Sequence, residues 1–430
     1  MKTISILACI YPFALITGPL LPEIITLILT LFIIVTAIKN KKISEIFFNK
    51  FSKYFFFFNI ALLASSIFSE NILFSLKTSL FYFRFYFLTI CLVYILKNNK
   101  NFEYKFSASV TICAILLCLD SIIQFNIGFN ILGMSKEGSS VVAGLFGDEY
   151  ILGSFLYKFF PFIIIFCIIR KNHLLMMFSF FIVIIAIGYS GNRVPFFLFS
   201  LLYFYYVIFI HQSVIFFNLN LTKISFFLLY TYSFLIFMAD SSLSKRFTHE
   251  IFERTSLKGL IFKTKAELVS DNTPVESIAI ETTSDNTPVD YIVSTILFTT
   301  EHSNLFNEAI EMFFDNPIIG VGVRNFRHSC KDKNKIDCST HPHSKFLEFI
   351  SELGVVGFII FVSFFIFISK NLIFNQKKDY KSLFSVIILL QIFPLIPAGS
   401  FFNNYNSTIF FLIFSFFIHH YHKDISEFKK

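Results

Sequence analysis

Residues 316–357 read NPIIGVGVRNFRHSCKDKNKIDCSTHPHSKFLEFISELGVVG. This stretch collects glycines, histidines and charged residues in a chain that is otherwise dominated by Phe, Ile and Leu. It leads directly into an apolar run that begins near Phe346 and has the length of a membrane-spanning helix. We therefore predict that it joins an extramembrane loop to a membrane helix and carries the active site.

The rest of the composition is that of a polytopic membrane protein. Of the 430 residues, 55% are hydrophobic and only 15% are charged. A helix crosses a bilayer in about 20 residues, and apolar runs of about that length recur along the chain. We predict an all-α polytopic membrane protein with about 12 transmembrane helices. The runs lie near 4–19, 21–38, 54–69, 78–96, 106–126, 152–169, 174–190, 194–211, 225–240, 346–369, 382–399 and 407–420.

Basic residues set the predicted orientation. The net charge of +8 could indicate a nucleic-acid partner, but most Lys and Arg lie in short loops between apolar runs. Positive charge in such loops marks the cytoplasmic side of a membrane. If the N-terminal run is a retained first helix with its start in the cytoplasm, the basic clusters all fall on that side. Topology thus explains the charge, and we expect no nucleic-acid partner.

This orientation divides the chain into three parts. Residues 1–240 would hold transmembrane helices 1–9, residues 241–345 one large periplasmic loop between helices 9 and 10, and residues 346–430 helices 10–12 with a cytoplasmic tail. Within the loop, SDNTPVE at 270–276 recurs as SDNTPVD at 284–290. Two copies are too few for a solenoid. The polar composition of 270–290 predicts a flexible insert that we expect to be dispensable.

Two pairs of residues stand out in the predicted loop. Gly320 and Gly322 follow an Asn-Pro pair that should end a helix capped by Ser303 or Asn304. Because glycine adopts positive φ readily, the pair suits a turn that presents N–H groups to an anion or a sugar. Cys330 and Cys338 would form a disulfide if the loop faces the periplasm. The other five cysteines fall inside apolar runs and are expected to be core residues. Both the glycine pair and the cysteine pair lie within residues 316–357.

The histidines are the candidate proton carriers. An imidazole such as that of His343, just before a membrane helix, titrates near neutrality and can accept a proton from a hydroxyl nucleophile. A loop histidine without a role is an equally good interpretation of an isolated His341-x-His343 pair. A metal site is a weaker one, because no carboxylate or Cys completes a ligand set. We therefore expect no metal.

The residues after His343 are interpreted as structural. In a helix that continued from His343, Glu352 would lie on the opposite face and about 13 Å away. We therefore expect Glu352 to anchor the helix or to contact another loop rather than to orient His343. Gly354 and Gly357 would allow close packing of helices in lipid.

Arginine and lysine side chains provide candidate anion contacts. Arg193 lies in GYSGNRVPFF at the predicted periplasmic mouth, where its guanidinium could bind a phosphate or reach lipid head groups. Arg84 and Lys158, together with Asp120, fall within apolar runs at similar predicted depth. An Arg84–Asp120 ion pair and a lipid-diphosphate site agree equally well with such buried charge.

Arg324, with Arg327, follows the glycine pair. It either extends a basic edge for substrate around the histidines or is a solvated loop charge.

Three motifs, taken in order, resemble the O-antigen ligase family of bacterial membrane proteins, which also includes O-antigen polymerases. They are S-x-N-R at 190–193, N-P-x-x-G-x-G at 316–322 and H-x-H-S-x-x-L-x-x-x-x-E-x-G-x-x-G at 341–357. GLFGDEYILGSFL at 144–156 looks like the segment that precedes the arginine motif in that family. The chain departs from the family pattern at Ser344, where Asn is usual, and at Asn192 and Val194, where Ser and Gly are frequent.

The resemblance implies an enzyme of the bacterial inner membrane that needs no cofactor. It would transfer a glycan from an undecaprenyl-diphosphate-linked donor to a lipid A-core acceptor on the periplasmic face. Membrane lipids would surround the protein. His343 would be the catalytic base, and Arg193 would bind the donor diphosphate. Two alternatives stay open: a polymerase of the same family that joins two lipid-linked repeats, and a transporter or flippase whose intramembrane charges mark a translocation path.

Overall fold

The computed structural model describes residues 1–48, 50–135, 141–210, 300–332, 339–373, 380–394 and 396–428. Within these ranges the regular elements are helices, and the β-type pairing is limited to one isolated bridge between Phe129 and Ser135. The principal helices are α1 (Lys2–Ala14), α2 (Leu20–Lys39), α3 (Ile43–Phe47), α4 (Lys50–Ile67), α5 (Ile72–Phe81), α6 (Phe83–Asn98), α7 (Phe102–Ile127), α8 (Leu152–Arg170), α9 (His173–Tyr189), α10 (Arg193–Tyr205), α17 (Thr300–Asp315), α18 (Phe326–Asp332), α19 (Lys345–Ile373), α20 (Tyr380–Gln391) and α21 (Asn404–Phe428). The described residues also include a 3-10 helix, η1 (Gly144–Phe146), and a π-helix, η2 (Tyr206–Ile210).

Five of the described helical segments are long and apolar enough to cross a membrane: α2, the consecutive α5 and α6, α7, α8 and α19. Shorter apolar helices, among them α1, α4, α9, α10 and α20, pack around them. The all-α architecture expected from the sequence is found in the part of the chain that the structure describes. The count of about 12 transmembrane helices and the large periplasmic loop stay predictions. The run at 225–240, the insert at 270–290 and Cys338 lie outside the described residues.

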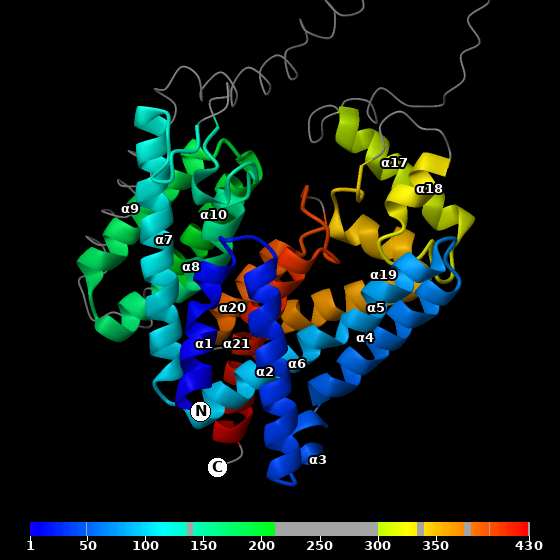
Figure 1. Cartoon of the computed structure of the whole chain (residues 1–430), viewed down its shortest axis with the longest axis horizontal. Helices are drawn as coiled ribbons and strands as arrows, with labels where there is room; N and C mark the ends of the chain where they lie inside the picture. The colour runs from blue at the N-terminus through cyan, green and yellow to red at the C-terminus, as the bar shows by residue number, and fades with distance from the viewer. Residues whose placement is uncertain are drawn as a thin grey trace, which may run out of the picture.

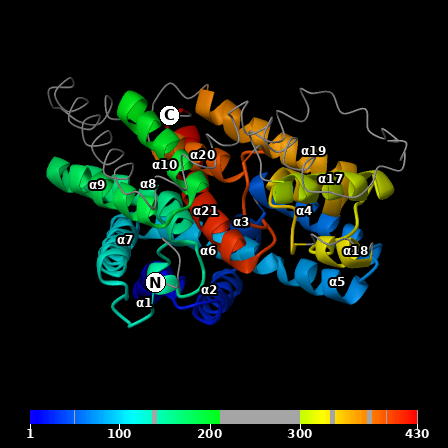
Figure 2. The ribbon, with the colours of Figure 1, turned by 90° about the horizontal axis from the view of Figure 1, so that it is seen from above.

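The C-terminal helices lie at the centre of the bundle. Seen from above, α21 lies between α8 to α10 on one side and α4, α5 and α17 to α19 on the other (Figure 2). Helix α21 packs chiefly against α6 and α20, and α20 also contacts α8. Figure 1 shows both chain termini at the lower end of the molecule and α17 and α18 at the upper end, above α19.

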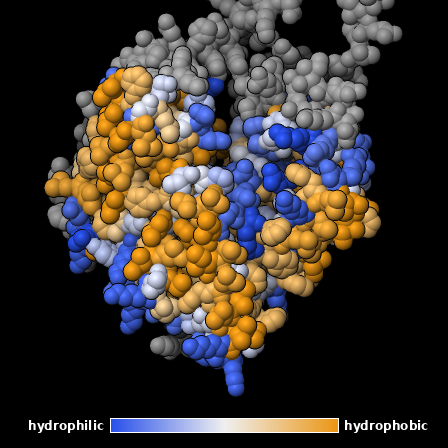
Figure 3. All heavy atoms as spheres, viewed as in Figure 1, coloured by the Kyte–Doolittle hydropathy of each residue, from blue (hydrophilic) through white to orange (hydrophobic). Residues whose placement is uncertain are grey.

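The surface of the bundle is largely apolar. Leu27, Leu31 and Val35 of α2 are 59%, 54% and 59% exposed. On the face of Figure 1, two broad hydrophobic areas are separated by a hollow in which hydrophilic atoms gather (Figure 3). Such extensive apolar exposure is costly in water and suits a lipid environment.

Two helices differ from the apolar runs that predicted them. The run at 346–369 was expected to be one continuous helix, but α19 is broken at Gly354, where φ is 61° and ψ is −150°. The run at 382–399 was also expected to be helical throughout. Instead, α20 ends at Gln391, and residues 396–403 form a connection, here called the 396–403 loop, that leads to α21. Pro394 and Pro397 favour this ending, because proline removes a backbone donor from a helix.

The break in α19 is filled by the loop that follows α17. Helix α17 begins at Thr300, earlier than predicted, and ends at Asp315 as predicted from the Asn-Pro pair. The loop then lies along the broken helix and exchanges backbone hydrogen bonds with it on both sides of Gly354. These bonds run from Val321 N to Ser351 O (2.9 Å), from Gly322 N to Glu352 O (3.1 Å) and from Val355 N to Pro317 O (2.8 Å).

Glycine is required on both sides of this contact. A Cβ atom on Gly320 would lie 2.3 Å from the carbonyl carbon of Glu352, and one on Gly354 would lie 2.5 Å from the carbonyl carbon of Ile318. Both glycines also have positive φ, at 72° and 61°. The two motifs N-P-x-x-G-x-G and E-x-G-x-x-G are thus two halves of one backbone contact.

We expect Gly320→Ala to destabilise the protein more than Gly133→Ala. Gly133 also has positive φ, at 80°, but no atom lies within 4 Å of a Cβ placed there. Its replacement should cost only the backbone strain of about 1–2 kcal/mol. Gly320→Ala adds a steric clash, typically about 1–3 kcal/mol more. Thermal unfolding of the detergent-solubilised variants measures the difference, and equal losses would contradict the contact.

Candidate active site

His343 lies on a turn before α19 rather than on the helix. Its φ is 54°, a left-handed value, and the helix begins two residues later at Lys345. The carbonyl oxygen of His343 accepts a hydrogen bond from Ala398 N at 2.7 Å. The next residue, Ser344, donates to Pro394 O at 3.1 Å and accepts from Leu347 N at 3.4 Å, so it also caps the helix. The backbone of His343 is therefore held between α19 and the segment that follows α20.

The two imidazoles lie side by side at this turn. Their ring centroids are 4.2 Å apart, and the rings are tilted by 36°. His343 Nε2 lies 3.1 Å from Ser339 Oγ, and His341 Nδ1 lies 2.8 Å from Thr340 Oγ1. Both rings are half-buried. Among the described residues, no three His, Cys, Asp or Glu side chains are placed to hold a metal ion. The chemistry that the turn itself offers is proton transfer by an imidazole.

A buried carboxylate secures the 396–403 loop. Glu348, in the first turn of α19, accepts hydrogen bonds from Phe401 N at 2.6 Å and from the Ser400 hydroxyl. Lys345, the first residue of the same turn, donates to Gln391 O at 2.6 Å. The first turn of α19 thus holds both the end of α20 and the 396–403 loop. Neither the role of Glu348 nor this loop was predicted from the sequence. Pro394, Pro397 and Gly399 within an apolar run were the available signal.

Lys158 reaches the same loop from α8. Its Nζ donates to Asn406 Oδ1 at 3.0 Å, and Asn406 Nδ2 donates to Ser400 O at 3.0 Å. The Lys158 side chain is only 5% exposed. Through Asn406, the lysine is therefore connected to the loop that also supports His343.

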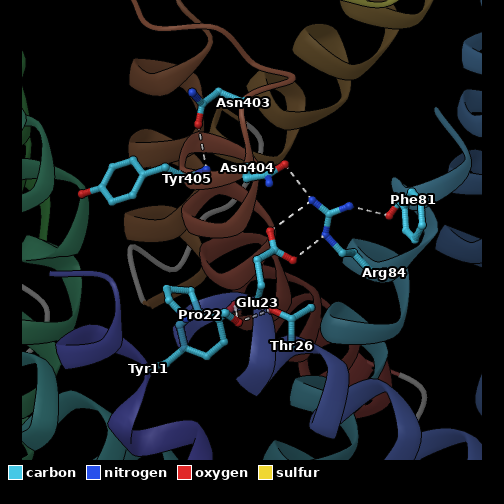
Figure 4. Close-up of polar contacts among 9 residues, drawn as sticks. All are labelled: Tyr11, Pro22, Glu23, Thr26, Phe81, Arg84, Asn403, Asn404 and Tyr405. Carbon is cyan, nitrogen blue, oxygen red and sulfur yellow. Dashed lines mark hydrogen bonds and ion pairs between the residues drawn. The ribbon is translucent and has the colours of Figure 1, made fainter. Parts of the chain in front are cut away.

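Arg84 forms a different ion pair from the one considered in the sequence. Its Nε lies 3.0 Å from Glu23 Oε2, and its Nη2 donates to Asn404 Oδ1 at 2.7 Å. Its Nη1 donates to Phe81 O at 2.8 Å, and Figure 4 shows this arrangement. Asp120 instead accepts from Ile131 N at 2.8 Å. The proposed Arg84–Asp120 pair is wrong, because similar depth along two helices does not place their side chains on facing surfaces.

Arg193 is the first residue of α10 and is exposed. The turn before it packs against the start of α8, where a Cβ on Gly153 would lie 2.6 Å from Ser190 Oγ. Asn192 Nδ2 donates to Tyr150 O at 2.7 Å, and its side chain does not cap α10. The segment 144–156 and the S-x-N-R motif are thus in contact, and Arg193 is held at the amino end of a helix.

The remaining predicted site residues support backbone packing. Gly320 N donates to Asn316 O at 3.0 Å, and Gly322 N donates to Glu352 O at 3.1 Å. The expectation that these two amides face an anion or a sugar is therefore wrong. The fully buried Glu352 accepts from Arg324 N at 2.7 Å, which agrees with a contact to another loop.

Three further residues predicted from the sequence are Arg324, Cys330 and Gly357. Arg324 is exposed, and its guanidinium lies 5.7 Å from the centre of the Phe74 ring of α5. Cys330 is buried and disulfide-bonded. A Cβ on Gly357 would lie 2.2 Å from Phe349 O, so this glycine relieves crowding within α19 rather than between helices.

Comparison with known families decides the assignment. The model of the family described as O-Antigen ligase matches residues 153–362, which contain all three motifs. Residues 153–362 carry the domain of the O-antigen ligase family. Members of this family transfer glycosyl groups, as ligases or polymerases. With its apolar helices, this family member is a membrane protein. A search of the curated proteins found no match to the chain.

We expect Glu348→Leu to loosen the 396–403 loop. Leucine fills a similar space but leaves Phe401 N and the Ser400 hydroxyl without their acceptor, at a cost of about 1–3 kcal/mol for each buried group. Glu348→Gln keeps one acceptor oxygen and should cost less. Thermal unfolding together with protease cleavage within 396–403 measures the effect. Equal stability and cleavage of the two variants would show that the loop does not depend on this carboxylate.

Proposed function

We propose that this member of the O-antigen ligase family is a polysaccharide ligase. It transfers a glycan from undecaprenyl diphosphate to lipid A-core at the periplasmic face of the bacterial inner membrane. His343 is the general base, and Arg193 binds the donor diphosphate. The proposal is supported by the family match over 153–362 and by the placement of His343.

The placement of His343 is the observation that carries the proposal. A half-buried imidazole stands on a turn whose backbone is fixed by Ala398, at the start of an apolar helix long enough to cross a membrane. Catalysis gains most from a group that is held in place before the substrate arrives. A lipid-linked substrate in the membrane would present its sugars at such a position.

The reaction balances without a further reactant. A hydroxyl of the acceptor sugar attacks the anomeric carbon of the donor glycan, and His343 accepts the hydroxyl proton as the new C–O bond forms. The bond between the anomeric carbon and the diphosphate oxygen breaks, and undecaprenyl diphosphate leaves with the electron pair. Arg193, an exposed arginine at the start of α10, is suited to bind that diphosphate because its guanidinium can donate several hydrogen bonds to phosphate oxygens. The buried Lys158 would supply a second cation once the diphosphate is bound, because a neighbouring anion favours the charged form of an amine. Charges held in place in this way stabilise a leaving group.

The positions of the chain termini and of the basic helix ends support the proposed orientation in the membrane. The two termini lie at the opposite end of the molecule from α17 and α18 (Figure 1). Helices α2 and α8 end on the basic residues Lys39 and Arg170. Since positive charge favours the cytoplasmic side, the end that bears α17 and α18 would face the periplasm.

Purified protein tests the reaction directly. We expect glycan transfer when undecaprenyl-diphosphate-linked glycan is supplied with lipid A-core, detected as a shift in gel mobility. Lengthening of the glycan in the absence of lipid A-core would instead identify a polymerase. Failure with both acceptors would reject glycosyl transfer and leave the transporter interpretation.

His343→Asn tests the base. Asparagine tolerates left-handed φ but cannot accept the proton at neutral pH, so kcat should fall by about 10²- to 10⁴-fold. Membrane insertion and thermal stability should be retained. The matched control is His328→Asn, because His328 packs against Phe74 in α5 and has no proposed part in transfer. Activity of His343→Asn within a few-fold of the control would remove His343 as the base.

A further inference from the structure

We propose that Glu23, Arg84 and Asn404 form a subsite that binds the hydroxyl groups of a sugar. The inference rests on the proposed use of glycan-bearing lipids and assigns Arg84 to a sugar rather than to the diphosphate. The three residues come from the starts of α2, α6 and α21 and converge on one point (Figure 4).

The position of this cluster is unusual for a purely structural ion pair. Arg84 lies near the middle of the apolar stretch Ile72–Asn98, which is long enough to cross a membrane. Charges at such positions face a wet cavity or a bundle interior and commonly mark a ligand pathway. The side chains of Arg84 and Glu23 are 20% and 32% exposed, so the pair is accessible from outside. In Figure 3 the region between α2 and α5 is a hollow lined by hydrophilic atoms.

The charge of the cluster favours a neutral ligand. The carboxylate of Glu23 lies against the guanidinium of Arg84 through both oxygens, at 3.0 Å to Nε and 3.2 Å to Nη2. Asn404 contributes a neutral amide. Because the two charges cancel, the cluster offers little attraction to a diphosphate. Lys158, whose Nζ hydrogen-bonds a neutral amide, is better suited to that charge.

The hydrogen-bonding groups that remain match a polyol. Among the described residues, none accepts a hydrogen bond from Asn404 Nδ2, and Asn404 is exposed. The carboxylate oxygens of Glu23 retain free lone pairs, because each can accept more than one hydrogen bond. A sugar hydroxyl both donates and accepts. Two adjacent hydroxyls could therefore donate to Glu23 and accept from Asn404.

The subsite is linked to the proposed base by the 396–403 loop. Ala398 binds the carbonyl oxygen of His343, and Asn404 follows at the start of α21. Six residues of extended chain span at most about 20 Å. An oligosaccharide can bridge that distance, so one sugar would be held at Arg84 while another reacts at His343.

Direct binding measurements on Asn404→Ala test the subsite. The full chain in lipid nanodiscs is titrated with undecaprenyl diphosphate carrying one oligosaccharide repeat, and separately with sugar-free undecaprenyl diphosphate. A parallel pair uses lipid A-core and lipid A without core sugars. We expect about tenfold weaker binding of one sugar-bearing lipid, equivalent to about 1.4 kcal/mol, and unchanged binding of its sugar-free counterpart. The affected pair shows whether donor or acceptor sugars occupy the site.

Two outcomes would overturn the inference. One is unchanged binding of both sugar-bearing lipids, and the other is an equal loss for a sugar-free counterpart, which would indicate a site for phosphate. The matched control is Asn126→Ala, an exposed asparagine near the end of α7. If Asn404→Ala lowers stability, Asn404→Leu repeats the test with a side chain of similar size that makes no hydrogen bonds, and it should show the same selectivity. Binding requires no turnover, so the two proposals can fail separately. A wild-type protein that transfers no glycan would reject the proposed ligase reaction, whereas a selective loss of binding to a sugar-bearing lipid would still support the subsite.

Discussion

The arrangement of the site depends on one close contact between two backbones, where the loop around Gly320 fills the break of α19 at Gly354. Backbone groups that are freed by the break are hydrogen-bonded to this loop, so the break is stabilised rather than frayed. The contact fixes the direction of the first half of α19, and with it the turn that carries His343. The glycines of the two motifs therefore act through geometry and not through ligand binding.

A second set of contacts joins this half-helix to the centre of the bundle. Glu348 holds the 396–403 loop, which supports His343 at Ala398 and continues into α21. Helix α21 packs on α6 and α20, and so the position of the imidazole is coupled to the helices that carry Arg84 and Lys158. A group held from both sides in this manner loses little freedom when substrate binds.

The sequence predicted the helices better than it predicted their contacts. Apolar runs reveal length and burial, and the motif order revealed the family, but neither shows which faces of two helices meet. The sequence therefore offered Asp120 as one partner for Arg84, whereas the structure pairs Arg84 with Glu23. The 396–403 loop was not predicted because its residues are as apolar as those of a membrane helix. The break at Gly354 was not predicted because glycine in a membrane helix can also serve close packing between helices.

The charges near the site separate into two kinds, and this separation limits how a charged and hydroxylated substrate can lie. Arg84 is neutralised by Glu23, whereas Lys158 is buried against the neutral Asn406. A buried cation without a carboxylate is unfavourable until an anion binds beside it. An ion pair whose charges already cancel gains little stabilisation from a further anion. A diphosphate would therefore lie toward α8 and sugars toward α2 and α6. The 396–403 loop, which contacts both groups through the start of α21, would define the boundary between them.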